Sequence, residues 1–366
     1  MALRRGGRGG RVPGLYRERG RKSVSTTKHE RPGVYSRYDA STVVSGGGSG
    51  KTVGIAALSE AEAGGLHALA RYEDAAAAFG AEDNLCRLAQ TLFRNGAAQV
   101  KAAPVAAEEG YEAAFALLEA EEDLAVIFCD STTLGVQQKL RESVENASQA
   151  RRERIAVVCP GSGENVSELV ARAEALNSER VVLAAPADGT GGALAAAAAA
   201  GAIAGENDPA VPLGGAELKG VDTLQAQYGD SEIDLLVRGG VTPLECVGGK
   251  VSVVRGVTTR TKSGTAADAT WRELTTIRIV DDVIPTVRSA LRAKFRRAKN
   301  TEQSRGAIRS QVVLELENKL AREIITGYDG VTVTADSENP TVCLVDFSFT
   351  VAHGLNQIWL SAHITV

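Results

Sequence analysis

The sequence predicts an α/β domain with a largely parallel sheet, followed by an α+β domain with two long helices and terminal strands. Between about residues 51 and 205, apolar strand-like runs alternate with helical patterns, as in a parallel sheet covered by helices. After a Gly-rich connection that ends at Gly220, this alternation stops, and the chain closes with two strongly alternating strands. The 366 residues therefore divide into an extended basic arm (1–35), an α/β domain (36–220) and a C-terminal domain (221–366), with 354–366 as a terminal strand.

The N-terminal arm has no helical period. Residues 1–31 hold ten basic and two acidic side chains, about +8, whereas the whole chain carries −4. Two Pro-Gly turns, at Pro13 and Pro32, flank a β-prone run that contains Val24 and Thr26. We expect this run to lend a strand to a sheet. A basic Gly/Arg arm is also compatible with nucleic-acid binding, which stays an alternative function.

The α/β domain is predicted from its alternating elements. Its expected strands are residues 52–58, 97–103, 124–129, 155–159 and 181–185. Its expected helices lie near residues 70–80, 84–94, 109–119, 133–149, 164–177 and 193–204. The last of these is Ala-rich, ends at Gly205 and should pack closely against its neighbours.

The C-terminal domain is expected to begin with short strands and to continue with two long helices. The strands are predicted at residues 235–237, 251–255 and 274–279. The helices are predicted at about 283–298, with Asp282 as N-cap, and at 306–325, stopped by Gly327.

Two strands with one apolar face each are predicted at the end of the chain. The apolar face of the first consists of Cys343, Val345, Phe347, Phe349 and Val351. The apolar face of the second consists of Ile358, Leu360, Ala362, Ile364 and Val366. Side chains two apart share one face of a strand, so each strand needs a sheet to cover it, in its own subunit or in a neighbour's.

A Gly-rich loop at residues 45–52 is similar to a phosphate-binding P-loop, so a nucleotide-binding protein that uses residues 46–52 is a second alternative. Two features count against it. The first Gly of that motif is Ser45 here, and the run from Thr52 to Leu58 has the pattern of a strand, whereas a P-loop opens a helix. A second Gly-rich turn, Gly161-Ser162-Gly163, falls short of a dinucleotide-binding pattern.

The residues that carry catalysis or bind metals are dispersed. Five cysteines stand far apart, with no CxxC pair, and no Ser or Cys lies in a hydrolase elbow. No apolar run reaches the length of a membrane span, and the N-terminus lacks the apolar core of a secretory signal. We therefore expect a protein that is not an enzyme, with no cofactor, metal or membrane span, and that stays in the cytoplasm where it is made.

The first long helix has a basic face. Arg288, Arg292, Arg296 and Lys299 follow helical spacing beside an apolar stripe formed by Ile284, Val287, Leu291 and Phe295. Clustered like charge without interleaved acids favours docking on an acidic surface over an ordinary solvated face.

The order of several short motifs resembles the tail sheath family of contractile-tailed phages, R-type bacteriocins and related injection systems. The matching segments are Arg31–Tyr35, Lys51–Ala56, Phe93–Ala98, Ala204–Asp208, Arg238–Pro243 and Val253–Thr261. Each motif is short, and their common order from about residue 31 to the C-terminus supports the resemblance.

The resemblance implies a structural subunit that polymerises around an inner tube and contracts from a metastable extended state, driving the tube through a cell envelope. It implies that terminal strands are exchanged between subunits, here through Val24 and Thr26 and through Ile358, Leu360, Ala362, Ile364 and Val366. The implied partners are further copies, the tube protein, and baseplate and terminator proteins, within a virion tail or tail-like particle assembled in the bacterial cytoplasm; no nucleic acid is expected. Arg288, Arg292, Arg296 and Lys299 are predicted to face the tube.

Overall fold

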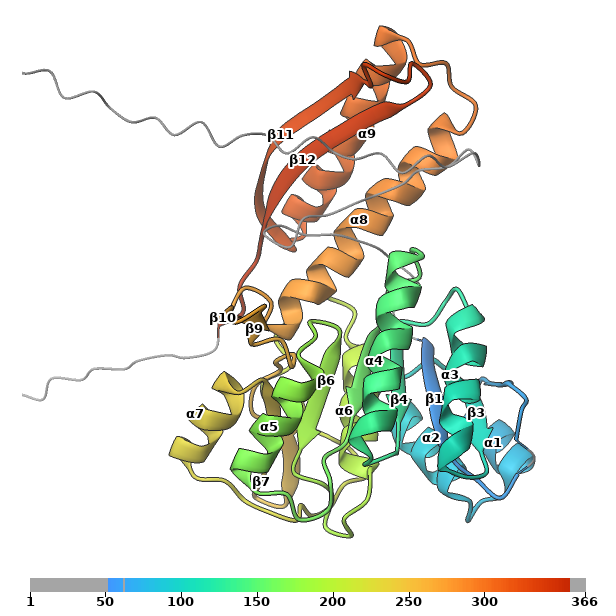
Figure 1. Ribbon diagram of the computed structural model, residues 1–366, viewed down its shortest axis with the longest axis vertical. Helices are drawn as coiled ribbons and strands as arrows, with labels where there is room; N and C mark the ends of the chain where they lie inside the picture. The colour runs from blue at the N-terminus through green and yellow to red at the C-terminus, as the bar shows by residue number, and fades with distance from the viewer. Residues whose placement is uncertain (1–51, 62, 356–366) are drawn as a thin grey trace, which may run out of the picture. The chain divides into compact units, whose positions relative to one another are not determined.

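Eight strands form one sheet, in the order β2-β3-β1-β4-β5-β6-β7-β8, in the computed structural model, which describes residues 52–61 and 63–355 (Figure 1). The strands are β1 (Thr52–Leu58), β2 (His67–Leu69), β3 (Gln99–Val105), β4 (Val126–Cys129), β5 (Ile155–Val158), β6 (Val181–Ala185), β7 (Val241–Val247) and β8 (Lys250–Val253). The six inner strands run parallel, and the edge strands β2 and β8 pair antiparallel with their neighbours. The predicted parallel sheet is thus confirmed.

Helices cover both faces of this sheet. They are α1 (Tyr72–Phe79), α2 (Asn84–Arg94), α3 (Tyr111–Ala120), α4 (Leu134–Gln149), α5 (Val166–Leu176), α6 (Leu194–Gly205) and α7 (Asp230–Arg238), with a short 3₁₀ turn η1 (Glu108–Gly110). Residues of α1, α2 and α6 share one buried cluster with the sheet, whereas residues of α3, α4, α5 and α7 share the cluster on the opposite face. The sheet is buried on both faces, which is why its central strands read as continuous apolar runs.

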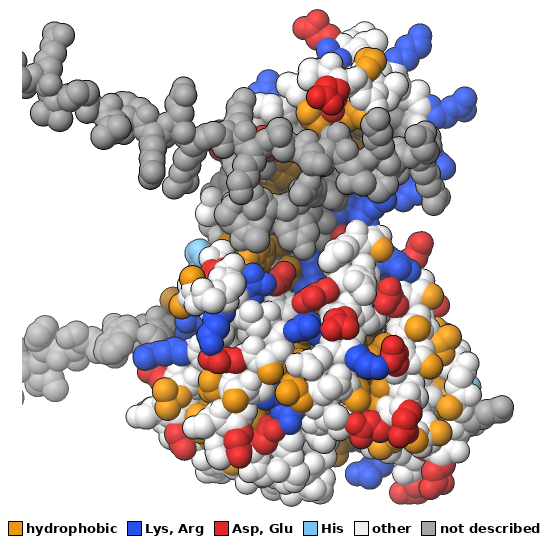
Figure 2. Space-filling model, in the orientation of Figure 1, with side chains coloured by type: hydrophobic (Ala, Val, Ile, Leu, Met, Phe, Trp, Pro, Cys, Tyr) orange, Lys and Arg blue, Asp and Glu red, His pale blue; other side chains and the backbone are white. Residues whose placement is uncertain are grey.

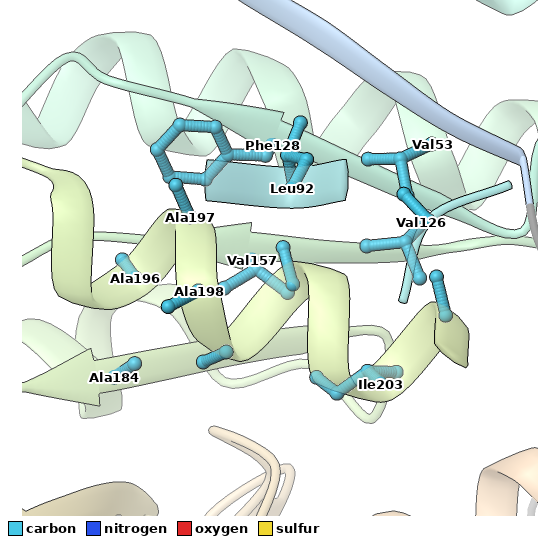
Figure 3. Packing of buried hydrophobic residues seen from close by; sticks show 14 of the residues in the cluster. Val53, Leu92, Val126, Phe128, Val157, Ala184, Ala196, Ala197, Ala198 and Ile203 are labelled. Carbon is cyan, nitrogen blue, oxygen red and sulfur yellow. The ribbon is translucent and has the colours of Figure 1, made fainter. Parts of the chain in front are cut away.

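The Ala-rich helix α6 lies directly on the sheet, as predicted. Figure 3 shows Ala197 and Ala198 of α6 among Val126, Phe128 and Val157 of the sheet, all of them buried. Small side chains let the helix backbone approach the strands closely, so the apolar area is buried without large residues.

The C-terminal part consists of two helices and a two-stranded sheet. The helices are α8 (Leu274–Phe295) and α9 (Glu302–Ala321), and the strands are β11 (Ile325–Ala335) and β12 (Cys343–Val351); a small hairpin of β9 (Lys262–Ser263) and β10 (Ala266–Ala267) precedes them. β11 and β12 pair antiparallel and join α8 and α9 in a third buried cluster. Alternation along β12 is confirmed, because Val345, Phe347, Phe349 and Val351 pack on that cluster.

Two predicted strands are wrong. Residues 235–237 lie in α7, where Glu232 completes a capping box with the backbone at Gly229. Ile233, Leu236 and Val237 have the spacing of one helix face, and a short apolar run cannot distinguish a helix from a strand.

Residues 274–279 form the first turns of α8, although their β-branched side chains favour a strand. Leu274, Thr275, Ile277 and Ile279 are all buried, so this segment is covered on several sides and packing outweighs the local preference.

The predicted helix ends also need correction. Asp282 is not an N-cap, because it lies inside α8, and α8 ends at Phe295. α9 begins after Thr301, whose hydroxyl accepts a hydrogen bond from the Ser304 N–H (3.2 Å), and ends at Ala321. Gly327 lies within β11, at an irregularity in the register, where the alternation of a strand has already replaced the helical period.

The eight-stranded sheet extends beyond residue 220, since β7 and β8 lie after that position. The division of the chain into domains stays a prediction.

Candidate assembly site

The sheet of β11 and β12 has an apolar face and a polar face. Phe347 and Phe349 stack with their ring centres 6.4 Å apart and pack on the cluster formed by α8 and α9, which includes Leu316. The alternate side chains of β12 are exposed: Asp346, Ser348 and Thr350. One face of this two-stranded sheet, which we call the β11–β12 ribbon, is thus anchored, and this fixes its orientation on the two helices.

Within the described residues, neither outer edge of the β11–β12 sheet pairs with a third strand. Such an edge presents backbone N–H and C=O groups to any further strand. A two-stranded sheet is also marginally stable by itself, so the ribbon gains hydrogen bonds and buried area when more strands join it. Chemically, the site can bind an extended polypeptide.

The sequence-predicted strand-exchange residues lie outside the described residues. They are Val24, Thr26, Ile358, Leu360, Ala362, Ile364 and Val366. The Gly-rich loop at residues 45–51 also lies outside, but the strand that follows it, β1, begins at Thr52. The chain after this loop is a strand, as predicted, so the helix that a P-loop requires at this point is replaced by β1.

Basic side chains at the C-terminal end of α8 and just after it are exposed. Arg292, Arg296 and Lys299 are exposed, with Arg296 and Lys299 placed just beyond the last helical residue. Figure 2 shows Lys and Arg side chains gathered where the end of α8 lies in Figure 1. We call Arg292, Arg296, Arg297 and Lys299 the basic tip.

Arg288 differs from the other three predicted tube-facing residues. Its guanidinium donates to Glu153 Oε1 (3.0 Å), the Glu153 side chain is 1% exposed, and the Arg288 side chain is 11% exposed. The structure therefore directs Arg288 toward the α/β part of its own chain, and three of the four predicted residues remain at the surface.

The carboxyl ends of β1 and β4 mark the point where the strand order reverses, a position where doubly wound sheets bind ligands. Asp130 follows β4 here and accepts hydrogen bonds from Leu58 N–H (3.2 Å), Asn84 Nδ2 (2.8 Å) and the Tyr111 hydroxyl. Burial raises the pKa of Asp130. Donors from the chain itself occupy this carboxylate, so the cluster joins β1, α2, α3 and β4 as a structural crosslink.

The Gly161 turn after β5 is occupied in the same way. The Gly161 N–H donates to Glu164 Oε2 (3.0 Å), and Glu164 is held by Arg172 Nε (3.0 Å). A carboxylate of the chain thus takes the place that an anionic ligand would fill. Neither this turn nor the Asp130 cluster favours a nucleotide-binding function.

The structure also bears on metal binding and on membrane insertion in the residues that it describes. Among the described residues, no group of three or more His, Cys, Asp or Glu is arranged to hold a metal ion. Three of the five cysteines are buried and two are half-buried. No helix in the described part of the chain is long and apolar enough to cross a membrane.

Two family models match this chain in succession. The model of the phage tail sheath protein central domain matches residues 105–259, and that of the phage tail sheath C-terminal domain matches residues 266–365. The tail sheath protein of Bacillus phage SP01 is 28% identical over 256 residues, which cover 66% of this chain and 43% of the relative. The chain therefore matches less than half of that relative's length.

Solved structures share the fold. A chain of the anti-feeding prophage baseplate matches with a TM-score of 0.71 and 15% identity, over 93% of this chain and 100% of the other. A chain of the contracted helical sheath of that prophage gives 0.68 and 16%, over 92% and 99%. The sheath tail protein of Desulfitobacterium hafniense gives 0.66 and 13%, over 87% and 100%.

The fold and the matched domains define a structural protein of contractile tails. Both domain models and the curated relative name a phage tail sheath protein, and the solved structures share the fold. The chain belongs to the contractile tail sheath family, and the resemblance predicted from its motifs is confirmed.

The ion pairs of Asp281 and Asp282 were not predicted from the sequence. Asp281 of α8 forms an ion pair with Arg180, which precedes β6, and Asp282 forms one with Lys319 of α9. The available signal was the presence of charged residues inside the otherwise apolar run from Leu274 to Leu291, where a buried charge requires a partner. Sequence spacing alone does not identify that partner, because Arg180 and Asp281 are 101 residues apart.

Proposed function

We propose that this chain is the repeating subunit of a contractile sheath. Copies assemble around an inner tube, with baseplate and terminator proteins at the ends, within a phage tail or tail-like particle assembled in the bacterial cytoplasm. Contraction from an extended state drives the tube through a target envelope. This mechanism needs no catalytic residue, cofactor or metal.

The observation that carries the proposal is the open two-stranded sheet. β11 and β12 are anchored on one face by α8 and α9, and within the described residues their outer edges have no partner strand. The sequence supplies two candidate strands, one around Val24 and Thr26 and one at Ile358–Val366. We propose that these strands complete the ribbon of a neighbouring copy, because main-chain pairing of this kind joins subunits while their bodies rotate.

The matches support polymerisation in particular. One of the similar structures is a helical sheath in the contracted state, and another belongs to a baseplate. If contraction buries a further ~400 Å² of apolar surface per subunit, the upper limit of the gain is about 10 kcal/mol, at roughly 25 cal/mol per Å². Summed over many copies, this free energy replaces nucleotide hydrolysis as the source of work.

A paired substitution tests strand exchange. Ile358→Asp with Ile364→Asp places charges on the apolar face of the last strand, and we expect the purified protein to lose its ability to form tubes in electron micrographs. The matched control, Gln357→Asp with Thr365→Asp, adds the same charges on the opposite face and should leave tubes intact. Deletion of residues 357–366 should act like the first variant. Normal contractile cylinders from that truncated protein would overturn the proposal.

A further inference from the structure

Three charged residues lie along one line of α8. Arg278, Asp281 and Arg288 are three and seven positions apart, so they share one side of the helix. The surrounding part of α8 is apolar and buried, as Leu274, Ile277 and Val287 show. Charges in such a setting are costly unless each one is paired.

Each of the three has a partner from the α/β part of the chain. The Arg278 guanidinium donates to the backbone carbonyl of Glu206 (2.9 Å), just after α6. Asp281 accepts two hydrogen bonds from Arg180 (2.8 and 3.0 Å), whose side chain is 2% exposed. Arg288 donates to Glu153, before β5, at 3.0 Å.

Asp282, the residue that follows Asp281, connects α8 to α9. Asp282 Oδ2 accepts a hydrogen bond from Lys319 Nζ of α9 (2.6 Å), and the Lys319 side chain is 7% exposed. The two consecutive aspartates therefore connect α8 to the sheet and to α9 respectively.

We propose that Arg278, Asp281 and Arg288, with their partners Glu206, Arg180 and Glu153, form a register lock that holds α8 in one axial position against the sheet. The charges alternate along the helix as positive, negative and positive. A shift by seven residues in one direction would place Arg288 against Arg180, two like charges in a buried site. The same shift in the other direction would place Leu274 there and leave Arg180 without its carboxylate.

The lock lies where α8 passes from one core to another. Leu274, Ile277 and Val280 belong to the cluster of the sheet, whereas Val283 and Val287 belong to the cluster of α9, β11 and β12. A helix held in one register transmits the displacement of the α/β part to the β11–β12 ribbon without slipping. This consequence for contraction rests on the proposed function, but the lock itself does not.

A charge exchange in the purified full chain tests the lock. Glu153→Arg and Arg288→Glu should each lower the midpoint of thermal unfolding by about 5 °C or more, because each leaves buried like charges together. Hydrogen exchange in α8 should rise by about tenfold or more in both. The double variant, with the pair reversed, should recover at least half of each change. The lock would be refuted if the single variants were as stable as the wild type. It would also be refuted if the double variant lost the sum of the two single losses in stability.

Milder variants keep the test decisive if a reversed charge prevents folding. Glu153→Gln, Arg288→Gln and their combination form a double-mutant cycle, in which we expect a measurable coupling between the two sites. Zero coupling would also refute the lock. The exposed pair Asp234 and Arg238 of α7 serves as a control, and its reversal should leave α8 exchange unchanged. These measurements need neither a tube nor an assembled sheath, so they are independent of the proposed function.

Discussion

Two buried arginines hold elements at the amino-terminal edge of the sheet. The Arg154 guanidinium donates to the backbone carbonyls of Leu118 (2.8 Å) and Glu121, and so binds the end of α3. Burial lowers the pKa of Arg154 to about 10. Arg180 binds the carboxylate of Asp281 (2.8 and 3.0 Å), whose side chain is 14% exposed. At this scale, the chain uses guanidinium groups because one of them satisfies several oxygens at once.

Asp281 should give the stability of the protein a distinct pH dependence. Burial raises its pKa to about 6, although the charge of Arg180 opposes this shift. Between about pH 4 and 6, Asp281 is protonated in the folded protein but ionised in the unfolded chain. Proton binding therefore stabilises the folded state at low pH, and this stabilisation is lost as the pH rises through about 6. We expect the wild-type protein to lose about 1.4 kcal/mol from this source between about pH 5 and 7.5.

The measurement is denaturant unfolding of the wild type and of Asp281→Asn at both pH values. The variant lacks the titrating group, so its unfolding free energy should fall less with pH than that of the wild type. Asp222→Asn, at an exposed position, is the control and should keep the wild-type slope. Identical slopes in all three proteins would exclude Asp281 as the source.

At the scale of elements, glycines set the distance between α2 and α6. A Cβ added at Gly201 would lie 2.8 Å from the Leu92 carbonyl oxygen and 2.8 Å from Asn95 Cβ. A Cβ at Gly205 would lie 2.9 Å from the Asn95 carbonyl oxygen. Two glycines one helical turn apart therefore form a flat strip on α6, against which the end of α2 packs.

Gly201→Ala should destabilise the protein by about 2 kcal/mol, because backbone atoms of α2 must move to admit the methyl group. The expected observation is a lower denaturant midpoint with an unchanged slope. Gly135→Ala is the matched control: Gly135 also lies in a helix, but an added Cβ meets nothing within 4 Å. This control should be neutral or slightly stabilising, by up to ~1 kcal/mol. Equal losses in both variants would contradict the packing argument.

The sequence was most informative where an element is buried in a regular pattern. The run Thr52–Leu58 and the Ala-rich helix were predictable because both faces of a parallel sheet are covered. The alternation of β12 was predictable because one face of the strand is exposed to solvent and the other packs on the core. Residues 274–279 misled, since their β-branched side chains favour a strand and only the surrounding cores make them helical. The register lock was beyond prediction, because its pairs join distant segments.

At the scale of the whole molecule, charge is unevenly distributed along the chain. Residues 288–309 hold eight basic residues and one acidic residue, although the whole chain has a net charge of −4. α8 is about 33 Å long at 1.5 Å per residue, and its buried ion pairs lie before the basic tip. The cations at the end of α8 are therefore available to a partner with an acidic surface. We propose that this partner is the inner tube in the extended state.

Reversing two charges of the basic tip should prevent assembly on the tube. In Arg292→Glu with Arg296→Glu, the proposed attraction between the basic tip and the acidic tube becomes repulsion in every subunit. Each exposed ion pair contributes only about 0.2–1 kcal/mol. Repeated around the tube, this loss should reduce the number of sheathed tubes in electron micrographs by about tenfold or more. Folding should be unaffected, because both side chains are exposed.

A matched reversal separates the effect of position from the effect of net charge. Arg87→Glu with Lys219→Glu changes the net charge by the same amount at exposed positions of the α/β part, and should leave assembly normal. Because weak surface pairs are screened, added salt should also reduce assembly of the wild type on the tube. Extended, tube-filled sheaths formed by the tip variant would mean that contacts other than these cations attach the subunit, and that the basic tip serves a different acidic surface.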